Sequence, residues 1–161
     1  MIKKFSEYLS EEKVGVYAAA ILTDESKTQL YEFVNDNLNL DKKIDKQDYH
    51  TTVAYSRKHV NVKLEPQDIK VSGTPLGYEL FDTQDGGKCL VLKIESDDLT
   101  ELHNTFKELG ASYDYDEYKP HITLCYDFKG KLEDLPLPEF DVKYNLLEVK
   151  PLDVDYRPED K

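Results

Sequence analysis

Two short segments of the chain carry the same pattern of reactive side chains. Residues 49–56 read YHTTVAYS and residues 120–127 read PHITLCYD, so each contains histidine, any residue, threonine, an apolar residue, any residue and tyrosine. Successive side chains of a β-strand point to opposite faces, so a histidine and a threonine two positions apart share a face. If both segments are strands, His50 pairs with Thr52 and His121 with Thr123. Two such strands side by side would direct two imidazoles and two hydroxyls into one groove.

This set of side chains suits the cleavage of a phosphodiester without a metal ion. An imidazole titrates near pH ~6.5, so at neutral pH one ring can accept a proton while the other donates one. The base would deprotonate a ribose 2′-hydroxyl, O2′ would attack phosphorus, and the acid would protonate the departing 5′-oxygen. Water would then open the resulting 2′,3′-cyclic phosphate with the roles reversed. Thr52 and Thr123 would donate hydrogen bonds to the non-bridging oxygens, where charge accumulates.

The other histidines and the cysteines lack this repeated context. His59 falls in a predicted loop and His103 in an acidic predicted helix, and we predict that both are surface residues. Cys125 would share the face of Thr123, but a nucleophilic role is disfavoured beside a histidine that already suits acid–base work. The two cysteines of the chain predict no disulfide framework and fit a reducing cytoplasm.

The spacing of the histidines, cysteines and acids does not favour a metal site. Close pairs such as His-x-x-x-His, typical of zinc sites, do not occur, and the acidic residues 114–117 lack the spacing and glycine of a calcium loop. We therefore expect no metal and no cofactor. Among the twelve tyrosines, Tyr17 and one of those at 113–118 are candidates for stacking on a base, a contact worth ~1–3 kcal/mol.

Composition and charge predict one acidic globular domain with a small ligand. The 161 residues carry 21 Lys and Arg against 33 Asp and Glu, a net charge of −12 that would repel a long nucleic acid. A few focused contacts can still hold a small phosphorylated ligand. No segment approaches the ~20 consecutive apolar residues of a membrane span, and no secretion signal is visible. We expect a monomer in the cytoplasm that binds no membrane.

The remaining pattern predicts an α+β domain with an internal duplication. The predicted elements are an N-terminal helix at 3–12, a buried strand at 14–22, a helix at 24–37, the first motif strand at 49–56, a hairpin of 69–81 (interrupted near 73–75) and 88–95, a helix from about 97 to 109, the second motif strand at 120–128, one or two strands at 140–152 and a charged tail at 153–161. Each half therefore runs strand, helix, motif strand, strand. This order predicts two pseudo-symmetric lobes, each a small antiparallel sheet with a helix, whose motif strands face a central cleft.

The paired motif on a duplicated scaffold resembles the two-histidine (2H) phosphoesterases, which include RNA 2′,3′-cyclic phosphodiesterases and RNA 2′,5′ ligases. Longer strings are similar to one branch of this family, the phage anti-CBASS nucleases; they are YAAAIL at 17–22, GYELFD at 77–82, KCLVL at 88–92 and DYDEYKPHITL at 114–124. The resemblance implies catalytic roles for His50, Thr52, His121 and Thr123. From their positions, Tyr17 in the first strand would stack on a base and Glu148 in the last would accept a hydrogen bond from a base amino group.

The resemblance also implies a substrate. Members of that branch degrade the cyclic di- and trinucleotide messengers with which bacteria trigger suicide on infection. The chain would hydrolyse 3′–5′ bonds of such messengers in the host cytoplasm, which agrees with its acidic charge. Two alternatives remain open: a phosphodiesterase acting on RNA 2′,3′-cyclic phosphates or 2′,5′ linkages, and a protein that sequesters a cyclic nucleotide without cutting it.

Overall fold

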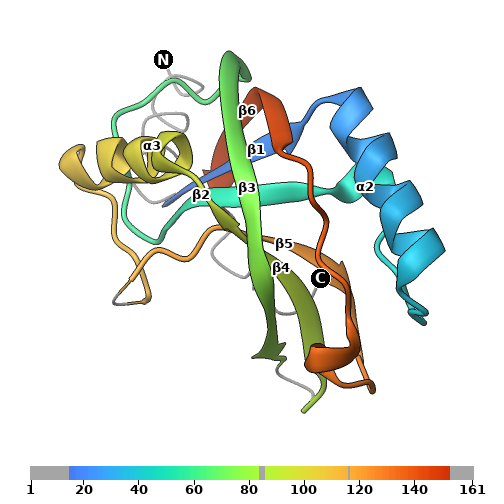
Figure 1. Cartoon of the computed structure of the whole chain (residues 1–161). Coiled ribbons are helices and arrows are strands. Elements are labelled where there is room, and N and C mark those ends of the chain that lie inside the picture. The colour runs from blue at the N-terminus through green and yellow to red at the C-terminus, as the bar shows by residue number, and fades with distance from the viewer. Residues whose placement is uncertain (1–14, 84–85, 116, 153–161) are drawn as a thin grey trace.

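A computed structural model describes residues 15–83, 86–115 and 117–152, which form an antiparallel sheet with two α-helices (Figure 1). The elements are β1 (Gly15–Leu22), α2 (Asp24–Asn37), η1 (Lys46–Asp48), β2 (His50–Ser56), β3 (Gln67–Asp82), β4 (Lys88–Glu95), α3 (Asp97–Glu108), β5 (His121–Cys125), η2 (Leu132–Asp134) and β6 (Val142–Leu152). The predicted α+β class is confirmed. The predicted helix at 3–12 and tail at 153–161 lie outside the described residues.

Both helices begin at the residues that the sequence predicts. The Thr23 hydroxyl accepts a hydrogen bond from the Ser26 amide at 3.0 Å, and acidic residues fill the first turn of α2. The Ser96 hydroxyl likewise accepts from the Leu99 amide at 3.1 Å at the start of α3. After α3, Gly110 takes a φ of +101°, a left-handed conformation that glycine adopts without steric cost.

The sheet has the strand order β2-β1-β6-β3-β4-β5, which places the motif strands at its two ends. Contrary to the predicted interruption near 73–75, β3 is one continuous strand that changes partner there. Gly73 pairs with Val142 of β6, whereas Thr74 pairs with Glu95 of β4. A Cβ at Gly73 would come within 2.3 Å of Ile94, so the strand packs too closely for a larger residue. The order has an internal symmetry: from one end it runs β2, β1, β6, and from the other it runs β5, β4, β3, with a motif strand first in each case.

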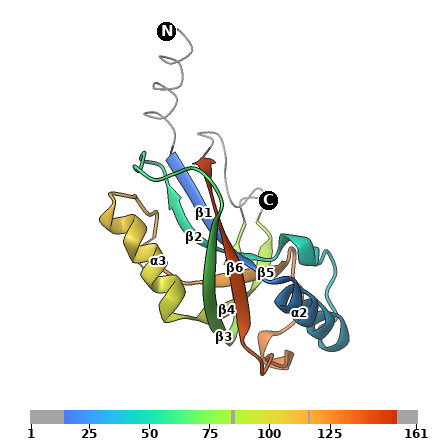
Figure 2. The same ribbon diagram turned by 90° about the horizontal axis from the view of Figure 1, so that it is seen from above.

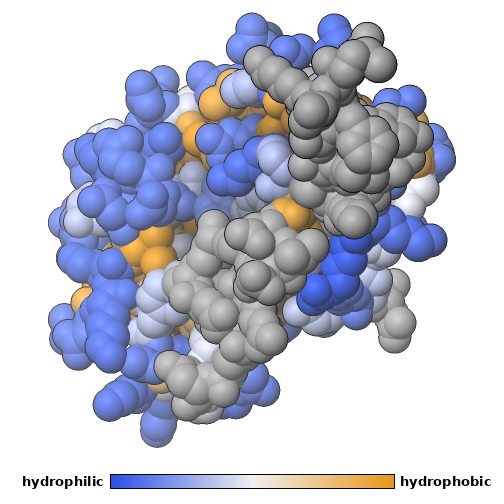
Figure 3. Space-filling view, turned by 180° about the vertical axis from the view of Figure 1, so that it is seen from behind, coloured by the Kyte–Doolittle hydropathy of each residue, from blue (hydrophilic) through white to orange (hydrophobic). Residues whose placement is uncertain are grey.

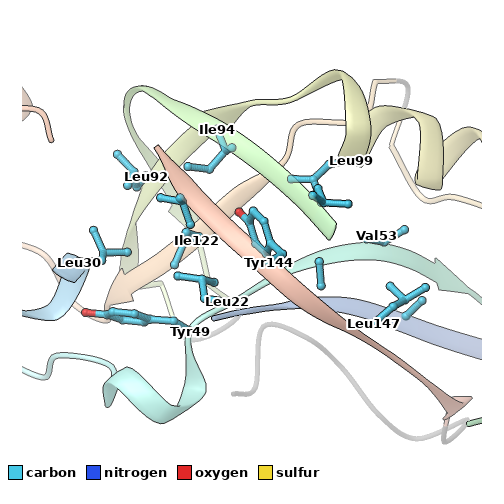
Figure 4. Close-up of a cluster of buried hydrophobic side chains, with 14 of the residues drawn as sticks. Leu22, Leu30, Tyr49, Val53, Leu92, Ile94, Leu99, Ile122, Tyr144 and Leu147 are labelled. Atoms are coloured by element: carbon cyan, nitrogen blue, oxygen red, sulfur yellow. The ribbon is translucent and has the colours of Figure 1, made fainter. Parts of the chain in front are cut away.

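The core lies on one face of this sheet and is shared by both halves. β1 contributes alternate residues to it, as a strand with one buried face does. Leu30 of α2 and Leu99 of α3 are fully buried in the same cluster (Figure 4). The two helices lie on opposite sides of the molecule (Figures 1 and 2). α2 packs against β6 and β1, and α3 packs against β3 and β2.

Hydrophilic side chains cover most of the non-grey surface in Figure 3, and apolar atoms form only small patches between them. Among the described residues, no helix is both long and apolar enough to cross a membrane.

Thr51, which lies between His50 and Thr52 of the first motif, points into the core. Thr51 is fully buried, and its hydroxyl forms a 2.8 Å hydrogen bond with the hydroxyl of Tyr144 on β6, which is also buried. Burial raises the pKa of the Tyr144 hydroxyl, which therefore stays protonated. This polar pair is one of the contacts that tie β2 to the rest of the sheet.

We expect Tyr144→Phe to lower the free energy of unfolding by about 1–3 kcal/mol, because it leaves the Thr51 hydroxyl buried without a partner. Adding Thr51→Val removes the orphaned hydroxyl, so the double variant should be more stable than Tyr144→Phe alone. Urea denaturation of the two variants and the wild type measures both differences. A double variant less stable than Tyr144→Phe would contradict this account.

Candidate active site

The two motifs lie on the face of the sheet opposite the core. In the register of β2 with β1, His50 is opposite Ile21 and Thr52 is opposite Ala19, which fixes the face of the first motif. In the register of β5 with β4, His121 is opposite Lys93 and Thr123 is opposite Val91. The face of the sheet that carries the histidines and threonines of both motifs is called the motif face.

Although β2 and β5 are the end strands of the sheet, they come into contact in space. The sheet therefore bends so far that its two ends meet, and the two imidazoles are close enough for the charge of His50 to lower the pKa of His121. This arrangement brings the two motif strands together, and with them the imidazoles of His50 and His121.

The two motif histidines make the same backbone hydrogen bond. His50 Nδ1 lies 2.8 Å from the carbonyl oxygen of Asp48, and His121 Nδ1 lies 2.8 Å from that of Lys119, two residues earlier in each case. A carbonyl oxygen can only accept, so Nδ1 carries a proton in both rings. In the neutral ring the lone pair is then on Nε2, which is the nitrogen available for proton transfer.

Burial lowers the pKa of His121 below its ordinary value, because it disfavours the charged ring. The hydrogen bond to Lys119 opposes this effect, His50 adds to it, and the carboxylate of Glu79 on β3 opposes it. Glu79 also lies 3.7 Å from the ammonium group of Lys93, and both side chains are about one-third exposed. The ring of Phe81 contacts the His121 ring edge-on, with centroids 4.7 Å apart.

Each motif contains a β-bulge immediately after its threonine. In β2, Ala54 is opposite Ala18 and Thr52 is opposite Ala19, so Val53 is an extra residue. In β5, Leu124 is the extra residue in the same way, between Thr123 and Cys125. A bulge shifts the alternation of side chains by one position.

The bulge in β2 explains why Tyr55 lies on the motif face, and the bulge in β5 corrects the prediction for Cys125. Tyr55 is opposite Tyr17 and joins it in a small cluster on the motif face, which an unbroken strand would not allow. Cys125, predicted to share the face of Thr123, is instead opposite Leu90 in the core and is 1% exposed. Burial raises the pKa of its thiol to about 11, so the thiolate needed for nucleophilic attack is disfavoured.

The structure places both predicted base-contacting residues on the motif face. The Tyr17 hydroxyl lies 3.3 Å from the Thr52 hydroxyl, and the Lys150 ammonium lies 5.5 Å from the centroid of the Tyr17 ring. Tyr17 is 6% exposed. Glu148 is opposite Ala19, the residue that is also opposite Thr52, so Glu148 and Thr52 occupy one row across three strands.

A second carboxylate, Glu79, occupies the position in the other half that is equivalent to that of Glu148, and the sequence did not indicate it. Glu79 is opposite Val91, which is opposite Thr123, so its row repeats that of Glu148 in the other half. No local spacing could have revealed this, because the relation depends on the register of three strands.

His103 was wrongly predicted to be a surface residue, whereas His59 is exposed as predicted. His103 is 4% exposed, and its Nδ1 donates a hydrogen bond to the carbonyl oxygen of Val53 at 2.8 Å. The signal was present in the sequence: Leu99, His103 and Phe106 have the i, i+4, i+7 spacing of a buried helix face, and all three are buried in α3.

Tyr118, one of the predicted stacking tyrosines, also contacts the first motif. Its ring is parallel to that of His103, with centroids 4.1 Å apart, and its hydroxyl donates to the carbonyl oxygen of Thr52 at 2.7 Å. Within the described ranges, no group of three or more His, Cys, Asp or Glu side chains is arranged to hold a metal ion.

Comparison with known proteins agrees with this arrangement. Residues 14–159 match the model of a family described as "Anti-CBASS protein Acb1". The chain belongs to the Acb1 family. It is 31% identical to the Acb1 of Vibrio phage KVP40 over 95% of this chain and 96% of the relative, and 35% identical to the Acb1 of Enterobacteria phage T4 over 70% and 72%.

The fold of this chain is also similar to that of solved phosphoesterases. A structure of E. coli LigT complexed with 3′-AMP has a TM-score of 0.53, 14% identity, and coverage of 87% of this chain and 95% of that chain. A structure described only as a phosphoesterase has a TM-score of 0.51, 14% identity, and coverage of 88% and 97%. These likenesses place the chain in the two-histidine phosphoesterase fold, with the two pseudo-symmetric lobes that the sequence predicts.

The charge relations around His121 predict how its pKa responds to substitution. The ring should titrate below pH ~6.5, and Glu79→Gln should lower its pKa further, because the carboxylate stabilises the protonated ring. NMR titration of the histidine C2–H signals measures both values. Glu148→Gln is the matched control, since Glu148 is not among the groups that shift His121, and it should leave this pKa unchanged. An unchanged His121 pKa in Glu79→Gln would refute the assignment.

Proposed function

We propose that this protein is a metal-independent phosphodiesterase that opens cyclic di- and trinucleotide messengers and thereby blocks CBASS signalling in the host cytoplasm. The main support is the pair of imidazoles: His50 and His121 come from the two ends of the sheet, interact through their charges, and hold the same Nδ1 hydrogen bond. Both rings therefore present Nε2 for proton transfer. Membership of the Acb1 family supports the cyclic substrate.

In the first step, one motif histidine acts as base and the other as acid. The neutral Nε2 removes the proton of a ribose 2′-hydroxyl, and O2′ forms a bond to phosphorus as the bond from phosphorus to the 5′-oxygen breaks. The protonated ring gives its Nε2 proton to that leaving oxygen. The ring of the messenger is then open, with a 2′,3′-cyclic phosphate at one end.

In the second step the proton roles reverse, and water opens the cyclic phosphate to leave a terminal phosphate. Thr52 and Thr123 donate hydrogen bonds to the non-bridging oxygens in both steps, when negative charge builds on them. The 3.3 Å contact with the Tyr17 hydroxyl supports this role for Thr52. If Tyr17 donates to the Thr52 oxygen, the Thr52 hydroxyl proton is directed to the substrate.

The substrate is small because the charge of the protein opposes a long polyanion. A net charge of −12 disfavours extended RNA, whereas a cyclic messenger carries only two or three phosphates. Glu148, in the row of Thr52, would accept a hydrogen bond from a base amino group. Stacking of a base on Tyr17 requires the Lys150 side chain, which lies over that ring, to move aside.

The direct test is to incubate the purified protein with 3′,3′-cyclic dinucleotides and cyclic trinucleotides in EDTA and to analyse the mixture by mass spectrometry. The messenger should gain one water. His50→Ala and His121→Ala should each lower the rate by about 10²–10⁴-fold, the usual contribution of a general acid or base. His59→Ala, a change at an exposed histidine, is the matched control and should cleave at the wild-type rate.

Each other outcome contradicts part of the proposal. Full activity in either motif variant would overturn the mechanism. Unchanged cyclic messengers together with hydrolysis of 2′,3′-cyclic phosphates or 2′–5′ oligoadenylates would change the substrate class. Intact messenger released from a heated complex would instead indicate sequestration without cleavage.

The mechanism also predicts the pH dependence of the reaction. A base and an acid that must hold opposite protonation states give a bell-shaped profile of kcat/KM. Glu79 raises the pKa of His121, so Glu79→Gln should move one limb of the bell to lower pH. Rates in EDTA across the pH range measure the shift, and Glu148→Gln should leave the limb of His121 in place. A limb displaced to higher pH in Glu79→Gln would contradict the assignment.

A further inference from the structure

The bulge after each motif threonine leaves a backbone carbonyl that needs a donor from outside the sheet. In the second motif, the Leu124 carbonyl accepts from the backbone amide of Ile44 at 2.9 Å. In the first motif, the equivalent Val53 carbonyl accepts from the side chain of His103 at 2.8 Å. The buried imidazole of His103 on α3 thus donates the hydrogen bond to the first bulge, whereas a backbone amide donates it to the second.

The neighbouring carbonyl of the first motif is held in the same way. The Tyr118 hydroxyl donates to the Thr52 carbonyl at 2.7 Å, and the Tyr118 ring stacks on His103 with an angle of 4° between the ring planes. Two consecutive carbonyls, those of Thr52 and Val53, are therefore bound by two stacked rings. Burial raises the pKa of Tyr118 and lowers that of His103, so both side chains are neutral at physiological pH, with Nδ1–H as the His103 donor.

This pair also connects the first motif to the second. Tyr118 directly precedes Lys119, whose carbonyl accepts the Nδ1 hydrogen bond of His121. One short segment therefore binds the backbone of Thr52 through its tyrosine and orients the ring of His121 through the next residue. Displacement of this segment would change the position of Thr52 and the direction of the His121 ring together.

We propose that His103 and Tyr118 are positioning residues that hold the bulge at Val53 and so set Thr52 and His50 against His121. They act through the backbone of β2 and do not touch substrate. The proposal rests on the proposed phosphodiesterase function for its kinetic readout. A displacement of about 1 Å can cost on the order of 10²-fold in rate when catalytic groups must be aligned.

The sharpest test compares two isosteric changes in the same cluster. Tyr118→Phe keeps the stacked ring and removes the donor to Thr52, whereas Tyr113→Phe alters a ring that contacts His103 edge-on at 4.6 Å. With a 3′,3′-cyclic dinucleotide in EDTA, Tyr118→Phe should lower kcat by about 10- to 100-fold with KM little changed. Tyr113→Phe should keep the wild-type kcat. Equal kcat in the two variants would overturn the proposal.

A second pair of variants separates positioning from stability. His103→Asn can place an amide N–H where Nδ1–H lies, whereas His103→Leu removes the donor, and both lose the stacked ring. Both should therefore lower Tm, and His103→Leu should lower it further because it leaves the Val53 carbonyl without a donor. At a temperature where both variants are fully folded, only His103→Leu should lower kcat by more than tenfold relative to His103→Asn. Equal kcat in the two folded variants would show that His103 is merely structural.

An NMR readout keeps this test independent of the proposed function. The C2–H signal of His50 should shift in Tyr118→Phe and His103→Leu and stay in place in Tyr113→Phe. If the wild type cleaves no phosphodiester, the proposed function fails, and the NMR result still decides whether the pair positions the motif. An unmoved His50 signal in Tyr118→Phe would overturn the positioning role.

Discussion

A β-bulge after each motif threonine is the constraint on which the site depends. Side chains of a regular strand alternate with a period of two, so histidine, threonine and the later tyrosine of the motif cannot all share one face. The extra residue, Val53 in β2, changes the alternation and brings Tyr55 onto the face of Thr52. The same shift in β5 turns Cys125 into the core, away from the face of His121 and Thr123.

A bulge takes a carbonyl out of the strand ladder, and a buried carbonyl without a donor is costly. In this fold the donors come from the opposite half of the chain. The segment after α2 supplies the Ile44 amide to β5, and α3 with the segment after it supplies His103 and Tyr118 to β2. The two motifs are therefore not independent sites, because each is held in place by the half that carries the other.

The two halves share a geometry but differ in charge. The rows that contain Glu148 and Glu79 correspond across the sheet, yet Glu79 interacts with both His121 and Lys93. In the first half, the position equivalent to Lys93 is Ile21, opposite His50. The two imidazoles therefore lie in unlike surroundings, which suits the proposed mechanism with one acid and one base.

Within the described residues, the sequence by itself determined the helices, most of the strands and the spacing of the four motif side chains, because these depend on local periodicity and on spacing within a few residues. It also pointed to the Acb1 family, which the comparisons show. Only the tertiary structure decided the unbroken path of β3, the bulges, the hydrogen bond of His103 to the Val53 carbonyl and the position of Glu79. Each of these depends on which strands pair, in which register, and on which distant group satisfies a buried carbonyl, and no local pattern specifies such long-range relations.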